Sequence, residues 1–506
     1  MSNRPQSPLS PRLLLVAVAF AAATPAQVPP GWCVVSAHKE DGAAYTGDGG
    51  IYLTAPRTPM AMHLVAGLPD ELTAATVPFP FPQAGPKSLG ANCILMHRSG
   101  DLLVAPVAQA NQAVELHRVP IVGSPSTGFS AGAITTILLG TAGASGGGIA
   151  QMAFVTDDVV LVAGRYVSGP MGTPGPHQIA LVDLTTQVVT PLTPGTLPRP
   201  ALVPNSLIAD IAGITYAAGT DTVSIGLRAN TTGIPGLTAA TSWICSFQLA
   251  APSPALVTWM AGTMTNLATR RITGGSETLA SLFVGSNSGR PVLYQVAAGG
   301  AVTVLLPNTA TSNWDVVNAI AIEPSTGEVL FCGNSIAGSL PTGGVHWLDS
   351  TSGTTHQLAN TLASNQPRGP LTGIAMAPAL TRSGTVSSCN GGPVECSWSY
   401  IPHPDKLPLA GNLNFFVDIA PGTIPGFALG CVGLAPLTPP STPLPQCPGL
   451  TLLVAPMAWG PLTGPMSNQL HIPLPGWLSG STIYTQCASW TQNGPSATDL
   501  LRIDIL

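Results

Sequence analysis

The chain has 506 residues, of which 8% are charged and 45% are hydrophobic, and its formal net charge is −5. Few charges together with many apolar residues exclude a disordered chain, and the lack of a basic stripe excludes nucleic acid as an expected partner. The 56 glycines and 52 prolines favour a turn-rich, all-β protein with many short strands.

The first 26 residues have the pattern of a secretory signal peptide, predicted at 1–26. Arg4 and Arg12 give a positive region, and an apolar stretch of 11 residues follows at Leu13–Ala23. That stretch is too short to span a bilayer and ends near a small residue, Ala26, suited to cleavage. A short membrane anchor is the alternative. No later apolar run reaches 18 residues, so we expect a secreted or cell-envelope protein without a membrane span in the mature chain.

A hydrophobic phrase returns about every 55 residues along most of the chain. Its apolar anchors are separated by 58, 59, 56, 53 and 54 residues and are Ile94, Met152, Ile211, Leu267, Ile320 and Ile374. A fixed period of this length indicates a repeat architecture. Each repeat divides into four short apolar runs separated by Gly, Pro, Ser and Thr, which is the pattern of one propeller blade.

The two ends of the repeat region complement one another. Residues 32–67 match only the second, third and fourth strands of a blade, and Thr372–Pro378 supplies a first strand. We therefore predict a closed β-propeller over 31–378, in which the last strand completes the blade that the N-terminus begins. Closure removes the strand edges that invite aggregation. The count is six blades; a seven-bladed propeller is the alternative, although Arg382–Pro408 lacks the pattern of a further blade.

The last full repeat contains the run Ala319-Ile320-Ala321-Ile322-Glu323-Pro324-Ser325-Thr326-Gly327. This run resembles the inner strand and first turn of six-bladed propellers of the NHL and lactonase-like superfamily. The resemblance implies a six-bladed propeller and opens the possibility of hydrolase or lyase chemistry. Lactonase-type propellers hold a metal with a set of Glu, Asn and Asp. Asp210 and the asparagines of this chain fit part of that set, but no matching Glu is found.

The strand spacing changes after the repeats. Residues 379–411 are predicted as a linker, and 412–506 as a small antiparallel β-sandwich because five or more strand-like runs follow without the earlier period. The stretch from Leu474 to Ala488 resembles C-terminal β modules of large secreted bacterial proteins. That resemblance implies a role in surface display or export, with a plain structural cap as the alternative.

The nine cysteines suit an oxidising compartment. Two pairs bracket turn-rich loops and are disulfide candidates: Cys389 with Cys396, and Cys431 with Cys447. Four others lie within apolar strand patterns and are expected to be buried thiols: Cys33, Cys93, Cys245 and Cys332. Cys487 is left without a candidate partner.

No catalytic residue is predicted. Two Gly-x-Ser-x-Gly matches occur, at Gly128–Gly132 and Gly143–Gly147, but neither precedes a helix as a nucleophile elbow would. The histidines are scattered without metal-binding spacing, and the carboxylates are sparse and lie at turns. No metal or cofactor is expected from this pattern.

One polar position is the best candidate for a binding site. It lies one or two residues before each of the apolar anchors and is occupied by Asn92, Gln151, Asp210, Asn266, Asn318 and Thr372. If the first strands line a central channel, these six side chains form a ring at one mouth. The ring either binds a small ligand, such as a sugar or a hydrated cation, or only caps turns and bonds neighbouring blades.

The sequence therefore predicts a secreted β-propeller that acts as a binding or surface-interaction protein. A carbohydrate or a cell-surface component is the expected partner, and a monomer is the expected state. A lactonase-like hydrolase or lyase that uses the channel mouth is one alternative. A structural protein of the cell envelope without a small ligand is the other.

Overall fold

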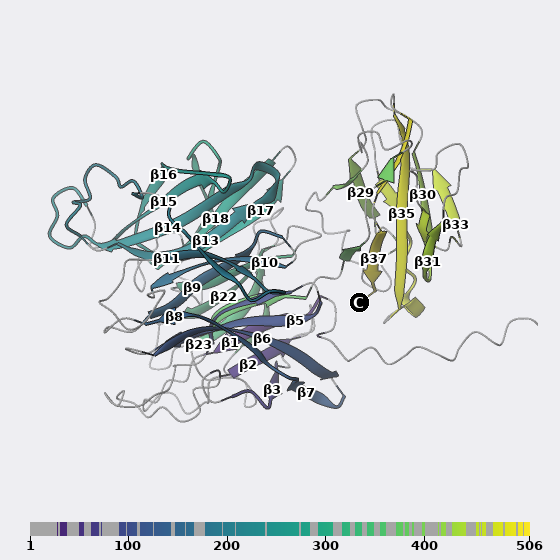
Figure 1. Cartoon of the computed structure of the whole chain (residues 1–506), viewed down its shortest axis with the longest axis horizontal. Helices are drawn as coiled ribbons and strands as arrows, with labels where there is room; N and C mark the ends of the chain where they lie inside the picture. The colour runs from purple at the N-terminus through teal and green to yellow at the C-terminus, as the bar shows by residue number, and fades with distance from the viewer. Residues whose placement is uncertain are drawn as a thin grey trace, which may run out of the picture.

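The computed structural model is built almost entirely of β-strands, which confirms the predicted all-β fold. It describes residues between 28 and 505; the gaps of eight residues or more are 1–27, 38–49, 73–90, 166–177, 284–291, 307–315, 361–370, 389–396, 400–412 and 442–451. The predicted signal peptide therefore lies outside the described residues. Figure 1 shows two lobes, one of purple to green strands and one of yellow-green strands that include β30, β35 and β37.

The described strands of the first lobe form six antiparallel groups of four, numbered I to VI. Group I contains β25 (Leu371–Met376), β1 (Cys33–Ala37), β2 (Gly50–Thr54) and β3 (Met62–Ala66). Group II contains β4 (Ala91–Met96), β5 (Asp101–Ala108), β6 (Ala113–Ser124) and β8 (Thr135–Thr141). Group III contains β9 (Gly147–Phe154), β10 (Val159–Arg165), β11 (Gln178–Asp183) and β12 (Val189–Leu192).

The other three groups follow in chain order. Group IV contains β13 (Asp210–Ala217), β14 (Thr222–Asn230), β15 (Ala240–Gln248) and β16 (Ala251–Ala261). Group V contains β17 (Thr263–Ile272), β18 (Gly275–Phe283), β19 (Leu293–Val296) and β20 (Val302–Leu306). Group VI contains β21 (Val316–Ile322), β22 (Val329–Ser335), β23 (Thr342–Leu348) and β24 (Thr355–Asn360). A short 3₁₀ turn, η1 (Ala218–Thr220), joins β13 to β14.

The first strands of the groups form a closed ring. Each of β25, β4, β9, β13 and β17 contacts the next strand of this series, and β21 follows β17 and contacts β25. Group I joins the two ends of the repeat region, because β1 pairs with β25 in an antiparallel register that sets Val34 opposite Ala375. The strand from the far end of the repeats thus completes the group that the N-terminal segment begins.

The apolar core is divided among the spaces between adjacent groups. One cluster joins groups I and II through Ile51 and Leu102, and another joins groups III and IV through Leu161 and Trp243. Corresponding clusters lie between groups II and III, IV and V, V and VI, and VI and I. Burial of apolar side chains contributes about 25 cal/mol per Å², so each group is stabilised by both neighbours. The ring is therefore held together by burial at all six interfaces.

A β-bulge interrupts every first strand. The register of each first strand shifts by one residue, which leaves one residue outside the pairing with the second strand. These six bulge residues are Asn92, Ala150, Ala212, Thr265, Asn318 and Thr372. Bulges bend a strand and redirect its side chains. The bulge recurs in all six groups. At this point each first strand directs a residue toward the axis of the ring.

An additional strand links the first two groups. The end of β6 turns back into β7 (Gly128–Ala131), which also pairs in parallel with β3, the last strand of group I. Phe129 of β7 is buried against the rings of Trp32 and His63. The hairpin thus covers the outer edge of group I, and covering an edge lowers the risk of aggregation. The Gly-x-Ser-x-Gly match at Gly128–Gly132 lies in this hairpin, and most of the second match lies outside the described residues.

The second lobe contains a large sheet and two smaller ones. The large sheet contains β26 (Leu380–Ser383), β27 (Ser387–Ser388), β30 (Ala428–Gly433), β33 (Ala458–Pro461), β35 (Thr482–Thr491), β36 (Gly494–Ala497) and β37 (Leu500–Asp504). The smaller ones contain β28 (Ser397–Ser399), β29 (Phe416–Ala420) and β34 (Gln469–His471), and β31 (Pro436–Ser441) with β32 (Leu452–Val454). A short 3₁₀ turn, η4 (Gly476–Leu478), follows β34.

The second lobe has its own core, in which Val417 and Leu470 of one sheet meet Ile483, Leu501 and Ile503 of another. Facing sheets with a shared core agree with the predicted sandwich, which stays a prediction. The strands β26, β27 and β28 lie within 379–411, where the sequence predicts a linker, and they pair with β37, β36 and β29. This segment therefore contributes strands to the second lobe. Its runs are too short and too polar to show a strand pattern.

The cysteines of the described residues are all free and buried. Four of them match the expected buried thiols, and burial raises the pKa of Cys33, Cys93, Cys245 and Cys332 to about 12. Cys431 is also a free thiol rather than half of a disulfide with Cys447, because it lies inside β30 and its sulfur donates to the Gln486 carbonyl. The candidates Cys389 and Cys396 lie outside the described residues.

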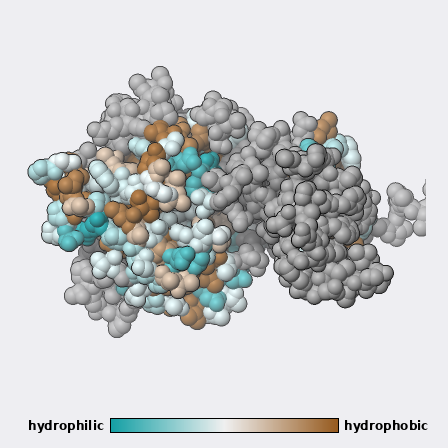
Figure 2. All heavy atoms as spheres, turned by 90° about the horizontal axis from the view of Figure 1, so that it is seen from above, coloured by the Kyte–Doolittle hydropathy of each residue, from teal (hydrophilic) through white to brown (hydrophobic). Residues whose placement is uncertain are grey.

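Among the described residues, no helix is long and apolar enough to cross a membrane. Only 8% of the residues of the whole chain are charged. Figure 2 shows apolar and polar residues interspersed on the face of this lobe that is seen from above.

Candidate functional site

A cavity of about 560 Å³ lies where the six first strands meet. Its walls come from all six strands of the ring and from β14, which contributes Arg228. Ligand pockets for small molecules are typically ~300–1,000 Å³, so the cavity is large enough for a small organic ligand. It lies at the axis of the ring, where the sequence predicts a channel.

Four of the six bulge residues connect their group to the next around the cavity. The Asn92 amide donates to the Ile149 carbonyl at 2.9 Å, and the Asn318 amide donates to the Leu371 carbonyl at 2.6 Å. The Thr372 hydroxyl donates to the Ala91 carbonyl at 2.9 Å. In every case the acceptor is the residue just before the bulge of the following group, and the Thr265 hydroxyl makes the same bond to Val317.

Two bulge residues are alanines and cannot make this bond. In group IV, where the bulge residue is Ala212, the guanidinium of Arg228 makes the corresponding hydrogen bond and donates to the Met264 carbonyl at 3.0 Å. At Ala150, the neighbouring Gln151 bridges instead, and its Oε1 accepts from the Ile214 amide at 3.0 Å. Side-chain hydrogen bonds therefore cross all six interfaces between adjacent groups.

Gln151 and Asn266 form one buried network. Gln151 Oε1 also accepts from the Leu267 amide at 3.1 Å, while its Nε2 donates to Asn266 Oδ1 and to the Leu267 carbonyl. Asn266 Oδ1 in turn accepts from the Ile320 amide at 3.3 Å. The network joins groups III to VI. Buried polar groups need such partners, because an unpaired one costs ~1–3 kcal/mol.

The six residues that the sequence analysis selects thus have different environments. Asn92, Asn318 and Thr372 occupy the bulge and line the cavity, and Gln151 and Asn266 line it from the adjacent position but are engaged in the buried network. Asp210 starts β13 and is not among the lining residues. Thr265 and Arg228 replace part of the predicted set. Thr265 differs from the predicted position by one residue, and Arg228 lies on a second strand, where no repeat pattern marks it.

Arg228 is the charged side chain among the described lining residues. It is half-buried, and in the described part of the chain its guanidinium makes the one hydrogen bond to Met264 and no ion pair. Asp210 stands opposite Arg228 in the strand register, but the Asp210 carboxylate lies outside the lining. The cavity therefore has a positive group and, among the described lining residues, no carboxylate.

The ends of the first strands beyond the bulges are more apolar. Leu95, Phe154, Ile322 and Met376 line the cavity there. Group IV contributes two hydroxyl groups to the cavity wall, those of Thr215 and Tyr216. The Thr215 hydroxyl donates to the Thr269 hydroxyl at 2.8 Å, and the Tyr216 hydroxyl donates to the Asp221 carboxylate at 2.8 Å. Burial, followed by the hydrogen bond and the charge of Asp221, raises the pKa of Tyr216, which keeps the phenol neutral.

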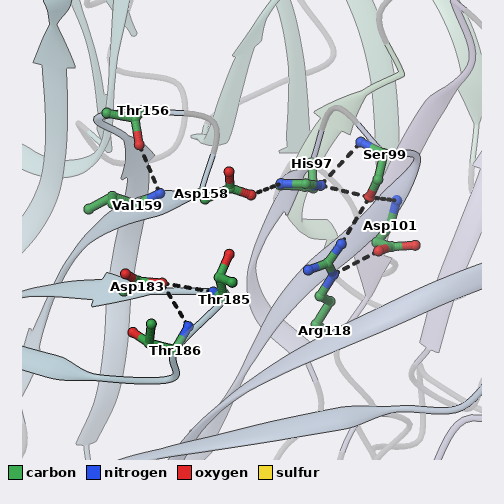
Figure 3. Close-up of polar contacts among 10 residues, drawn as sticks. All are labelled: His97, Ser99, Asp101, Arg118, Thr156, Asp158, Val159, Asp183, Thr185 and Thr186. Atoms are coloured by element: carbon green, nitrogen blue, oxygen red, sulfur yellow. Dashed lines mark hydrogen bonds and ion pairs between the residues drawn. The ribbon is translucent and has the colours of Figure 1, made fainter.

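A second polar cluster lies at the turn after β4. Figure 3 shows His97 between Ser99 of its own turn and Asp158, which comes from the β9–β10 turn. His97 Nδ1 lies 2.6 Å from Ser99 Oγ, and His97 Nε2 lies 3.7 Å from an Asp158 oxygen. Arg118 bonds both Ser99 and Asp101. The Ser99 backbone amide also donates to His97 Nδ1, so the histidine stabilises the hairpin turn.

Four histidines lie on third or fourth strands of the groups: His63 on β3, His117 on β6, His346 on β23 and His356 on β24. His346 is buried and stacks on Phe331 with ring centroids 5.2 Å apart, and this burial lowers the pKa of His346 to about 3. Among the described residues, no group of three or more His, Cys, Asp or Glu side chains could hold a metal ion.

Comparison with known proteins finds likeness at the level of structure. No family model matches the chain, and no curated protein matches it. Solved structures with some likeness include TolB from Acinetobacter baumannii, with 13% identity, a TM-score of 0.39, and coverage of 69% of this chain and 67% of that chain. An oligogalacturonate lyase in complex with manganese has 9% identity and a TM-score of 0.33 over 94% of this chain and 98% of that chain. An ACO/RPE65 chimera has 12% identity and a TM-score of 0.31 over 66% of this chain and 71% of that chain.

Proposed function

We propose that this protein is a secreted six-bladed β-propeller, with groups I to VI as its blades, that binds a small polar ligand in the cavity at its axis. The observation that carries the proposal is unused hydrogen-bonding capacity at the cavity wall. Among the described residues, the amides of Asn92 and Asn318 each spend one N–H on a neighbouring carbonyl. Each keeps a second N–H and an oxygen for a ligand.

A sugar fits this lining. Amides and hydroxyls pair well with sugar hydroxyls, and the apolar end at Leu95, Phe154 and Met376 offers a surface to the face of a sugar ring. Export, supported by the signal-like pattern of residues 1–26, would bring the protein to extracellular or envelope carbohydrate.

The test is a glycan array, followed by calorimetry with the glycan that gives the strongest signal. The double substitution Asn92→Ala and Asn318→Ala removes two amides, and we expect roughly tenfold weaker binding or more. Asn230→Ala, at an exposed turn, is the matched control and should leave affinity unchanged. Circular dichroism confirms that the variants fold. Equal affinity of wild type and double variant, or no glycan signal at all, contradicts the proposal.

One observation favours a hydrolase as the second candidate. Ser99, His97 and Asp158 contact one another in the spatial order of a nucleophile, a general base and the carboxylate that orients the base. The Arg118 guanidinium lies 3.3 Å from the Ser99 hydroxyl oxygen. The His97 ring is only 3% exposed, however, and is tied into its turn, which is why we place binding first. Hydrolysis of p-nitrophenyl acetate that Ser99→Ala abolishes would reverse this order.

A further inference from the structure

We infer that Arg228 makes the cavity selective for an anion, and that the ligand is a small carboxylate that also carries hydroxyl groups, such as a sugar acid. The inference rests on the proposed function and names the substrate class for the same cavity. Arg228 differs in its partners from the other arginines of the first lobe that the structure describes.

Those other arginines have clear structural partners. Arg270 is buried against Glu277, Arg118 pairs with Asp101 at 2.7 Å, and Arg199 donates to the Pro204 and Leu207 carbonyls. Arg228 instead uses one N–H on the Met264 carbonyl, and within the described residues the rest of its five N–H donors have no protein acceptor. A half-buried positive group with few partners is costly, and a bound anion offsets that cost.

The cavity that Arg228 lines also offers space for such an anion. Ala150 and Ala212, the two bulge residues that lack a polar side chain, line the same cavity as Arg228. A planar guanidinium can hold both oxygens of a carboxylate in parallel N–H···O bonds. Asp210, the nearest carboxylate by strand register, makes no ion pair with Arg228 in the described part of the chain.

The remaining lining fixes the rest of the ligand. The amides of Asn92 and Asn318 present one N–H and one oxygen each, which suit hydroxyl groups rather than a second charge. The apolar residues beyond the bulges can cover a ring face. A cavity of about 560 Å³ accommodates a molecule of monosaccharide or disaccharide size.

The experiment compares sodium D-glucuronate with D-glucose, which differ mainly by the carboxylate, in calorimetric titrations of the full chain. We expect wild type to bind glucuronate roughly ten- to a hundredfold more tightly than glucose, because charge-assisted hydrogen bonds are worth ~1.5–3 kcal/mol. Arg228→Gln should remove this preference, because it weakens glucuronate binding far more than glucose binding. Raising the salt concentration should weaken glucuronate binding in wild type only.

Two further variants keep the result interpretable. Arg228→Lys retains the positive charge but lacks the planar guanidinium with its parallel N–H donors. This variant should give an intermediate preference for glucuronate over glucose. Arg502→Gln, in the second lobe on β37, is the matched control and should bind both sugars as wild type does. Thermal melting shows whether each variant folds.

The outcomes separate this inference from the proposed function. Equal affinity of wild type for the two sugars, with both weakened by Asn92→Ala and Asn318→Ala, overturns the anion preference and leaves the sugar site standing. A glucuronate preference that persists in Arg228→Gln also overturns it. If neither sugar binds and sodium sulfate and sodium acetate do not bind either, the anion site is refuted, and the glycan array decides the proposed function separately.

Discussion

At the residue scale, the polar side chains around the cavity have two roles: some line the cavity at a bulge, and others form the buried network. The sequence does not distinguish these roles. Asn318 and Asn266 are both asparagines near the start of a first strand, but the first lines the cavity at a bulge and the second is buried in the Gln151 network. The difference arises because a bulge inserts one residue, and in five of the six groups the bulge residue lies two positions before the apolar anchor. Asn318 has this spacing, whereas Asn266 lies one position before its anchor. The sequence thus predicts the region of the site, while the structure assigns the role of each side chain.

The Gln151 network requires a glycine beneath it. A Cβ at Gly213 would lie 2.4 Å from Gln151 Oε1 and 2.9 Å from the Leu267 amide nitrogen. We therefore predict that Gly213→Ala lowers the free energy of unfolding by ~1–3 kcal/mol, the usual cost of overpacking a core. Urea denaturation measures it.

Gly219→Ala is the control for this substitution. Gly219 follows β13 in η1, and a Cβ there would meet no atom within 4 Å apart from those of its chain neighbours. A change of stability in Gly219→Ala as large as that in Gly213→Ala would show that the Gln151 network does not demand the glycine.

At the scale of elements, the strands within each repeat are largely predictable because apolar residues recur with the strand period. In group VI, the apolar runs of the repeat at Ala319–Ile322, Val329–Cys332 and Val345–Leu348 each fall inside an observed strand. The hairpin extension at β7 and the short strands β26 to β28 are not predictable in this way. Their pairing comes from partners distant in sequence rather than from a local pattern.

The hairpin of β17 and β18 contains a buried ion pair that tests how these strands are joined. Arg270 and Glu277 face each other in the register and pair at 6% and 3% exposure, and Gln295 of β19 also donates to Glu277. We predict that Glu277→Gln lowers the free energy of unfolding by ~3–5 kcal/mol, because a buried guanidinium would lose its counter-charge. Chemical denaturation provides the value.

The comparison is Asp101→Asn, which breaks the more exposed pair with Arg118 on β5 and β6. Exposed ion pairs contribute ~0–1 kcal/mol, so the loss should be small. If both substitutions have the same effect, the Arg270–Glu277 pair does not hold β17 and β18 together as the structure implies.

At the scale of the whole molecule, the defining property is a ring closed by strands from both ends of the repeat region. Six apolar clusters and a side-chain hydrogen bond at every interface depend on this closure. The closure is predictable from the sequence, because residues 32–67 lack a first strand and Thr372–Pro378 lacks the other three. The position of Arg228 in the cavity wall is not predictable, since β14 carries no repeated polar position.

A cross-link between β1 and β25 tests the closed ring most directly. Cys33 lies opposite Met376 in the register, and directly opposed residues of antiparallel strands have Cα atoms ~4.5–5.5 Å apart, within the range for a disulfide. The single substitution Met376→Cys should therefore form a disulfide with the native Cys33 under mild oxidation, identified by mass spectrometry of the linked peptides. Ala375→Cys, whose side chain packs in a different core cluster from Cys33, should not. The closed ring is contradicted if the new thiol at position 376 stays reduced, links to another cysteine, or links no better than the one at position 375.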